Sequence, residues 1–336
     1  ICRNGNCVQL LLAQSNHVLT KLMGLSMKKN NFLTRCCPVC GVEPPKNAAI
    51  CTPKCAEDLD LEAVTQSWKG FFKEKVIFSY ARCQKCSLLY CPTFFNESQL
   101  EVLYDQMSPN MDEVPMAALV DTQSGYFNFL KKSSPLIGGY VEIGPDIGLF
   151  TEHCVREGSF TEYWLFEPNR AVKPALENVV KNHKAHVIQE MTDFTAIPDG
   201  GVSAAVIIHV MDHLLDPVAT LSALKKKLTS QARVLIVTHD ESSLLRRLFS
   251  WRWPAFCLQH PQIYSPQTTK ALFKAAGFDV IEQHKTVNHF KLSFLVKHGL
   301  WALGIKVNRV PSFGDITIGL KLGNILTIAE PSEELV

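Results

Sequence analysis

Short apolar segments alternate with amphipathic ones from Gly139 to the end of this 336-residue chain. The apolar segments are nearly continuous in Val, Ile, Leu and Ala, which is typical of strands that are buried on both faces of a sheet. We expect seven strands, at 140–143, 163–166, 185–189, 204–209, 232–238, 280–284 and 325–329. We expect helices between them at 150–157, 170–183, 217–228 and 268–276. The alternation predicts an α/β fold with a mostly parallel sheet and helices on both faces.

Cysteines are concentrated before this region. Ten of the twelve lie in the first 91 residues. The uneven distribution favours a local metal site in a reduced, cytoplasmic protein over a disulfide scaffold. Two CxxC turns aim four thiolates at one point, which suits a tetrahedral structural zinc ion. The predicted ligands are Cys37, Cys40, Cys83 and Cys86, with Cys51, Cys55 and Cys91 as competing ligands.

These two patterns predict the domain organisation. We expect a disordered tail at 1–31, a zinc ribbon at 32–96, a helical linker at 97–135 and the α/β domain at 136–330. Since the first residue is Ile and Met27 is followed by a polar segment, we expect residues 1–26 to lie outside the natural chain. No apolar run is long enough to predict a membrane span. The formal charge of +2 argues against a strongly polybasic, phosphate-binding protein.

A glycine-containing turn follows the first predicted strand of the α/β domain. Its sequence, Val-Glu-Ile-Gly-Pro-Asp-Ile-Gly, carries Glu142, Gly144, Asp146 and Gly148. Glycines at such a turn let the backbone approach a ligand closely. Glu167, followed by Pro168, ends the next strand, where a carboxylate accepts hydrogen bonds from both hydroxyls of a ribose. The two features together predict a nucleoside-containing cofactor.

The turn distinguishes two nucleoside cofactors. A dinucleotide site uses G-x-G-x-x-G, and the carboxylate of Asp146 would repel the phosphates of a dinucleotide. S-adenosylmethionine carries an ammonium group, which favours carboxylates such as Glu142. Asp193 and Phe194 follow the third strand, where a carboxylate can bind the adenine amino group and an aromatic ring can stack on the base. These residues favour S-adenosylmethionine.

Four segments in order, VEIGPDIGLF, WLFEP, TDF and HVMDHLLDP, resemble class I S-adenosylmethionine-dependent methyltransferases. The preceding CPVCG and RCQKCSLLY segments resemble a subgroup that has an N-terminal zinc ribbon and acts on sugars and secondary metabolites. The resemblance covers residues 36–330 and implies the Rossmann-like, seven-stranded methyltransferase fold, with EC 2.1.1 activity. The chain departs from the family pattern at Asp146, where a glycine is usual, and at Val202–Ala204, which lacks an acidic residue.

Methyl transfer to a hydroxyl or a carbon acid needs a base, and histidine is the usual side chain for this task. Four histidines lie near strand ends or in the aromatic segment before Tyr264. We predict His209 and His260 as catalytic residues. His213 and His239 are the other two, and Asp240 is placed to orient His239.

The acceptor that we expect is a small molecule or a carbohydrate, methylated on oxygen or carbon. An RNA methyltransferase with the zinc ribbon as its RNA-binding module is one alternative, because residues 1–100 carry 12 Lys and Arg against 7 Asp and Glu. A non-catalytic methyltransferase-like protein is another, and a dinucleotide oxidoreductase is the least favoured. We expect 244–256 and 286–313 to form helical insertions, and the oligomeric state stays open.

Overall fold

The computed structural model describes residues 31–68, 75–104 and 114–333, except 306, 308, 312, 313 and 315. The predicted tail therefore lies outside the described residues, apart from Asn31. None of the helices in the described ranges has the length and hydrophobicity that a bilayer crossing needs.

The described part of the α/β region forms a seven-stranded sheet with the order β11-β14-β9-β8-β5-β6-β7. Its strands are β5 (Ile137–Ile143), β6 (Ser159–Phe166), β7 (Ala185–Ile188), β8 (Val202–Ile208), β9 (Leu228–His239), β11 (Phe278–Lys285) and β14 (Asn324–Pro331). Only β14 runs antiparallel to its neighbours in this sheet. All seven predicted strands are present in the predicted order, so the fold class is confirmed.

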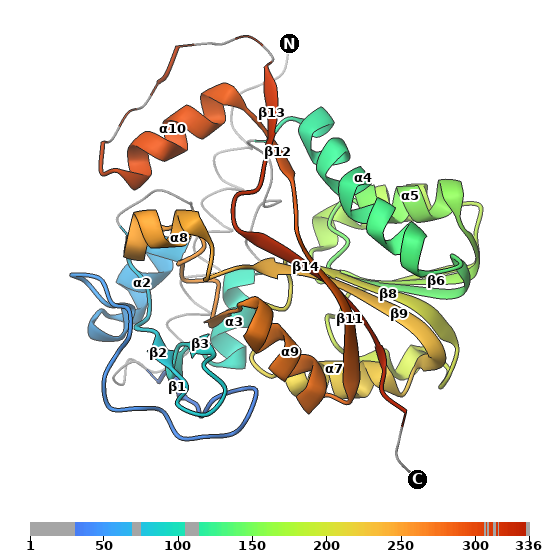
Figure 1. Ribbon diagram of the computed structural model, residues 1–336, viewed down its shortest axis with the longest axis horizontal. Helices are drawn as coiled ribbons and strands as arrows, with labels where there is room; N and C mark the ends of the chain where they lie inside the picture. The colour runs from blue at the N-terminus through green and yellow to red at the C-terminus, as the bar shows by residue number, and fades with distance from the viewer. Residues whose placement is uncertain are drawn as a thin grey trace, which may run out of the picture.

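Helices cover both faces of the sheet (Figure 1). One face packs against α4 (Met116–Ser133), α5 (Leu149–Glu157) and α6 (Lys173–Val179). The other packs against α7 (Pro217–Lys225) and α9 (Pro266–Ala275). Buried aliphatic side chains from both faces of the same strands enter these two cores, which explains why the strands read as continuous apolar runs.

The chain runs from β5 towards β6 and β7 on one side, and returns through β8 and β9 on the other. The order of the strands therefore reverses between β5 and β8. Ligands of open α/β sheets bind at the carboxyl ends of the strands at such a point. Both the glycine-containing turn and His209 follow these two strands directly.

The cysteine-rich segment is built from short elements at the left of Figure 1. These are β1 (Leu33–Thr34), η1 (Ala56–Asp58), α2 (Leu61–Trp68), β2 (Ala81–Arg82), β3 (Leu89–Tyr90), β4 (Thr93–Phe94) and α3 (Glu97–Tyr104). Residues 75–82 form only isolated bridges at Ile77 and Tyr80 and the two residues of β2.

This segment shares its core with a distant part of the chain. Strand β10 (Gln262–Ile263) pairs with β3, and Cys91 N donates a hydrogen bond to Pro261 O at 2.8 Å. Trp253, Phe256 and Ile263 lie in one hydrophobic cluster with side chains from the N-terminal elements. The cysteine-rich segment is therefore packed onto the insertion that follows β9, although the two are far apart in sequence.

The two predicted helical insertions are shorter than expected. Residues 244–256 contain α8 (Leu244–Phe249) and the 3-10 turn η4 (Ser250–Arg252). Residues 286–313 contain β12 (Asn288–Lys291) and α10 (Leu292–Ala302), and β12 pairs with β13 (Thr317–Leu320). The prediction of a helical insertion was wrong here, because residues 288–291 pair with β13 and the buried Asn288 donates a hydrogen bond from Nδ2 to the Tyr126 hydroxyl of α4 at 2.8 Å.

Candidate functional site

The turn after β5 lies against the loop that follows β8. Gly144 has φ +70°, and a Cβ atom there would lie 2.4 Å from Val210 Cγ2. A side chain at this position is therefore excluded by both the backbone conformation and the neighbouring loop. Asp146 has φ +51° and Gly148, with φ +84°, is the N-cap of α5. The turn is held in a conformation that brings its backbone close to the strand ends.

Glu142 is buried beneath this turn, with 2% of its surface exposed. Its Oε2 accepts hydrogen bonds from the Tyr140 hydroxyl at 2.6 Å and the Thr151 hydroxyl at 2.5 Å. Burial raises the pKa of Glu142 to about 7, with the charge of Glu167 adding to the rise and the two hydroxyl groups opposing it. A cation bound nearby would stabilise the ionised carboxylate, so the site suits the ammonium group of the expected cofactor.

We expect Glu142→Gln to stabilise the ligand-free protein at pH 8 and to leave its stability unchanged at pH 4.5. Because the pKa of the folded state is raised, the contribution of Glu142 to stability is present at acid pH and is lost as pH rises through about 7. A shift of this size corresponds to at most about 3 kcal/mol. Urea unfolding at both pH values measures the difference. Glu177→Gln, on the exposed face of α6, is the control, and a pH-independent effect of Glu142→Gln would contradict the assignment.

Glu167 follows the last residue of β6 and is fixed by two backbone groups. Its Oε2 accepts a hydrogen bond from Asp146 N at 3.0 Å, and its Oε1 accepts one from Asn169 N at 2.8 Å. Burial raises the pKa of Glu167, while these two hydrogen bonds oppose the rise. A carboxylate offers about four acceptor positions, so two remain for the hydroxyl groups of a ribose. Pro168, next to it, is exposed.

Asp193 and Phe194 lie beyond the end of β7. Asp193 is exposed and caps the 3-10 turn η3 (Phe194–Ala196), with its Oδ1 accepting a hydrogen bond from Thr195 N at 3.0 Å. Phe194 is only 3% exposed, and its ring meets that of Phe166 edge to face at 5.1 Å. Most of this ring is used in core packing. The adenine-binding roles of both residues stay predictions.

Four histidines meet beside the carboxyl ends of β8 and β9. The ring centroids are 4.9 Å apart for His209 and His239, 4.8 Å for His239 and His260, and 4.6 Å for His213 and His260. His209 has φ +54°, an uncommon conformation for a residue with a side chain. Burial, together with the nearby His239, lowers the pKa of His209 to about 3. The structure thus brings together both predicted catalytic histidines.

Asp212 is the partner of His239. Its carboxylate is completely buried, and its Oδ2 accepts hydrogen bonds from His239 Nδ1 at 2.8 Å and from His239 N at 3.1 Å. Asp240, which the sequence placed to orient His239, instead accepts hydrogen bonds from Ser242. Sequence reasoning missed Asp212, although its position three residues after His209 was the available signal.

His260 is buried and its Nδ1 lies 2.7 Å from Ala255 O. A neutral imidazole that donates from Nδ1 keeps Nε2 as an acceptor. Burial lowers the pKa of His260, but pairing with Cys257 and the charge of Asp212 outweigh this and raise it to about 9. His260 therefore holds its proton more strongly than an ordinary histidine, and it accepts a proton from another group only in its neutral form, above about pH 9.

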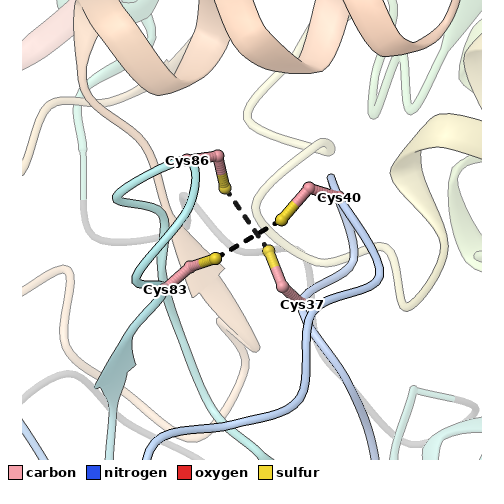
Figure 2. Close-up of side chains that lie close together, drawn as sticks. All are labelled: Cys37, Cys40, Cys83 and Cys86. Carbon is pink, nitrogen blue, oxygen red and sulfur yellow. Dashed lines mark hydrogen bonds between the residues drawn. The ribbon is translucent and has the colours of Figure 1, made fainter.

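The two CxxC turns converge (Figure 2). Cys37 Sγ lies 3.5 Å from Cys86 Sγ, and Cys40 Sγ lies 3.4 Å from Cys83 Sγ. In a tetrahedron with zinc–sulfur bonds of about 2.3 Å, the sulfur atoms are about 3.8 Å apart. The four thiols therefore fit one zinc ion with small adjustments. Among the described residues, the four-cysteine cluster excludes Cys51, Cys55 and Cys91, the predicted competitors.

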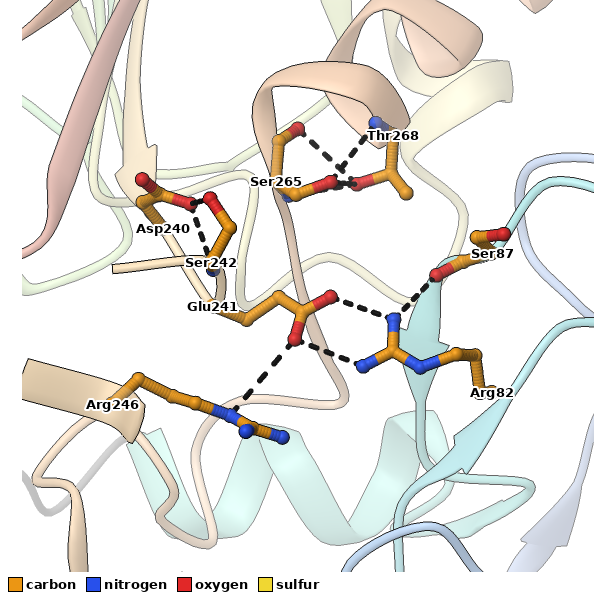
Figure 3. Close-up of polar contacts among 8 residues, drawn as sticks. All are labelled: Arg82, Ser87, Asp240, Glu241, Ser242, Arg246, Ser265 and Thr268. Carbon is orange, nitrogen blue, oxygen red and sulfur yellow. Dashed lines mark hydrogen bonds and ion pairs between the residues drawn. The ribbon is translucent and has the colours of Figure 1, made fainter. Parts of the chain in front are cut away.

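The second CxxC turn is linked to the loop after β9 (Figure 3). Arg82, just before Cys83, forms a bidentate ion pair with Glu241, with its two Nη atoms 2.7 and 2.9 Å from the carboxylate oxygens. It also donates a hydrogen bond to Ser87 O. Glu241 N in turn donates to Tyr264 O at 2.8 Å. The cysteine cluster is therefore connected, through a few contacts, to the loop that follows His239.

Comparison with known families agrees with this geometry. A family model described as a methyltransferase domain matches residues 116–283, which is half of the chain. The chain belongs to the S-adenosylmethionine-dependent methyltransferases. The family resemblance seen in the sequence is thereby confirmed, and the methyltransferase domain contains the turn after β5, Glu167 and the histidine cluster. A comparison with curated proteins finds no match.

Many solved structures resemble the methyltransferase domain. A SAM-dependent methyltransferase from Leishmania major is 14% identical, covering 63% of this chain and 72% of its own, with a TM-score of 0.42. A riboflavin-derivative dimethyltransferase, RosA, from Streptomyces davawensis is 16% identical, covering 70% and 60%, with a TM-score of 0.41. A SAM-dependent methyltransferase from Methanosarcina mazei is 12% identical, covering 61% and 98%, with a TM-score of 0.42.

Proposed function

We propose that this protein is an active methyltransferase that moves a methyl group from S-adenosylmethionine to oxygen or carbon of a small-molecule or carbohydrate acceptor. One observation carries the proposal. At the point where the strand order reverses, the carboxylates of Glu142 and Glu167 lie beside a glycine turn, and a histidine cluster follows the adjacent strand. A cofactor site and a source of bases thus occupy neighbouring strand ends.

The residues present fit the cofactor. Glu142 and Glu167 are buried carboxylates whose pKa values are raised by burial, so a bound cation would favour their charged forms. We propose that Glu167 holds the ribose hydroxyls and that Glu142 and the turn hold the amino acid end. The cofactor supplies an electrophilic methyl group on a sulfonium. Asp193, Phe194 and Pro168 are the proposed contacts to adenine and its surroundings.

In the proposed reaction, the acceptor oxygen or carbon forms a bond to the methyl carbon while the carbon–sulfur bond breaks and its electron pair stays on sulfur. The acceptor loses a proton, and we propose that a histidine of the cluster takes it. His260 is the first choice: in its neutral form, which its raised pKa places above about pH 9, Nδ1 donates to Ala255 O and Nε2 can accept the proton. His209 is the second. The protein's main task is to hold acceptor and methyl group in line and in contact.

We propose that the four cysteines hold a structural zinc ion. Four thiolates leave no open position on a tetrahedral ion, so this site supports the fold and takes no part in methyl transfer. Cys37 and Cys83 are each 2% exposed and lie in the core shared with the methyltransferase domain. A role in packing therefore fits these turns better than an RNA-binding role.

Thermal unfolding with added ligands tests the cofactor. We expect S-adenosylmethionine and S-adenosylhomocysteine to raise the midpoint by several degrees, because a ligand at 100 times its Kd adds about 2.7 kcal/mol. NAD is the control and should have no effect. A shift with NAD alone would contradict the proposal. Transfer of a labelled methyl group to sugar nucleotides and to RNA then separates the two acceptor classes, and steeply salt-dependent RNA binding would favour RNA.

A further inference from the structure

The histidine cluster contains a set of metal-ligating atoms that the proposed base does not use. One ligand atom each from His209, Asp212 and His239 lies within 4.8 Å of the other two. His239 Nδ1 and Asp212 Oδ2 are already 2.8 Å apart. Ligand atoms bound tetrahedrally to one transition metal at about 2.0–2.2 Å are about 3.3–3.6 Å apart. The His209 side chain is partly exposed, and its ligand atom lies within 4.8 Å of the other two.

A second observation concerns hydrogen bonding at these side chains. Within the described part of the chain, Asp212 Oδ1 and His209 Nδ1 are buried atoms without a hydrogen-bond partner. Asp212 itself is 0% exposed. An unpartnered carboxylate oxygen inside a protein costs about 1–3 kcal/mol or more, and a bound ion or a functional role is among the explanations for such an atom in a native protein. A cation between Asp212 and His209 would satisfy both atoms.

The backbone supports the same site. His209 adopts φ +54° directly after β8, and its N–H donates a hydrogen bond to Val237 O at 2.9 Å. Strained backbone of this kind is typical of functional sites. His239 ends the neighbouring strand β9, and its backbone N–H donates a hydrogen bond to Asp212 Oδ2. The three ligating residues thus come from two adjacent strand ends and the turn between β8 and α7, and the backbone N–H groups of His209 and His239 are both hydrogen-bonded.

We propose that His209, Asp212 and His239 bind a divalent first-row transition metal ion, such as Zn²⁺, Mn²⁺ or Fe²⁺, in addition to the zinc ion of the cysteine cluster. Two imidazoles and one carboxylate are a common donor set for such ions and leave coordination positions open. An open position beside the cofactor site would bind an acceptor hydroxyl or enol and favour its ionised form. The role of the ion thus rests on the proposed function. In this arrangement His209 is a ligand, and the acceptor proton passes to His260.

Metal content of the full-length protein tests this proposal without an acceptor. Protein that has been reconstituted with excess Co²⁺ and desalted is expected to hold two ions per chain by elemental analysis. One should show sulfur-to-cobalt charge-transfer absorption from the cysteines, and the other should show only the ligand-field bands of nitrogen and oxygen ligands. In His239→Gln, the second ion and its bands should be lost while the sulfur bands remain.

His213→Gln is the matched control. It removes a neighbouring histidine that is hydrogen-bonded to the Tyr104 hydroxyl and lies outside the donor set, so both ions should remain. The proposal would be overturned if the wild type held one ion per chain and that ion were bound only by sulfur. Asp212 and His239 would then be a hydrogen-bonded pair without a metal. The wild-type spectrum decides this even if a variant fails to fold. Binding of S-adenosylmethionine, measured on the same samples, reports separately on the proposed function.

Discussion

Substituting Cys83 by serine is expected to lower the unfolding midpoint of the zinc-loaded protein by about 10 °C or more. Structural zinc sites bind with apparent free energies of about 10–16 kcal/mol in small peptides, which is comparable with the whole stability of a domain. Cys83 is 2% exposed, and the turn that it begins packs onto the methyltransferase core. The loss of one ligand should therefore destabilise far more than one short loop.

The contacts beyond the cluster predict how far this effect reaches. Arg82 joins the turn to Glu241, and β3 joins it to β10, so opening of the turn removes support from the loop after β9. Amide hydrogen exchange should therefore rise at 240–264 as well as at 83–91. The measurements are scanning calorimetry, zinc content and exchange, each with and without a chelator.

Cys51→Ser is the matched control for Cys83→Ser. Cys51 is an exposed cysteine of the same segment and lies outside the cluster. This variant should keep one zinc ion and an unchanged midpoint. If Cys83→Ser kept its zinc and its midpoint, the four-cysteine site would be wrong. If zinc were lost and the midpoint stayed, the site would bind metal without supporting the fold.

The sheet could be predicted from the sequence because its signal is local. Strands buried on both faces need nearly continuous apolar residues, and the strands inside the sheet have them, whereas the edge strands β7 and β11 carry polar residues as well. The paired cysteines could be predicted for a similar reason, since a CxxC turn positions two thiolates by itself. In both cases the pattern that forms the structure lies within a few consecutive residues.

The shared core and the partner of His239 could not be predicted, because both depend on contacts between distant segments. Tyr80 donates a hydrogen bond to His260 O at 2.6 Å across 180 residues, and no local pattern reports this pairing. Asp240 was the nearest acid to His239 in sequence, whereas Asp212 is nearest in space because β8 and β9 are adjacent. The strand order decides which acid meets which histidine.

Replacing Glu167 by alanine is expected to weaken binding of S-adenosylmethionine by about 100-fold or more. The carboxylate is proposed to accept two hydrogen bonds from the ribose, and hydrogen bonds to a charged group contribute about 1.5–3 kcal/mol each. Its position is already fixed in the ligand-free protein by Asp146 N and Asn169 N, so the cofactor meets a preorganised acceptor. Isothermal titration calorimetry measures the change in Kd.

Two further variants separate the loss of a ligand contact from damage to the turn. Glu177→Ala removes an exposed glutamate of α6 that pairs with Lys173 at 3.7 Å, and it should bind the cofactor like the wild type. Glu167→Gln keeps the shape of the side chain and removes its negative charge. Because burial raises the pKa of Glu167, the buried charge is unfavourable in the ligand-free protein, so this variant should stay folded while cofactor binding falls. Unchanged Kd in both Glu167 variants would remove Glu167 from the cofactor site. A binding loss that appears only with a lowered unfolding midpoint would instead assign Glu167 to support of the turn, because its bond to Asp146 N would then be its main contribution.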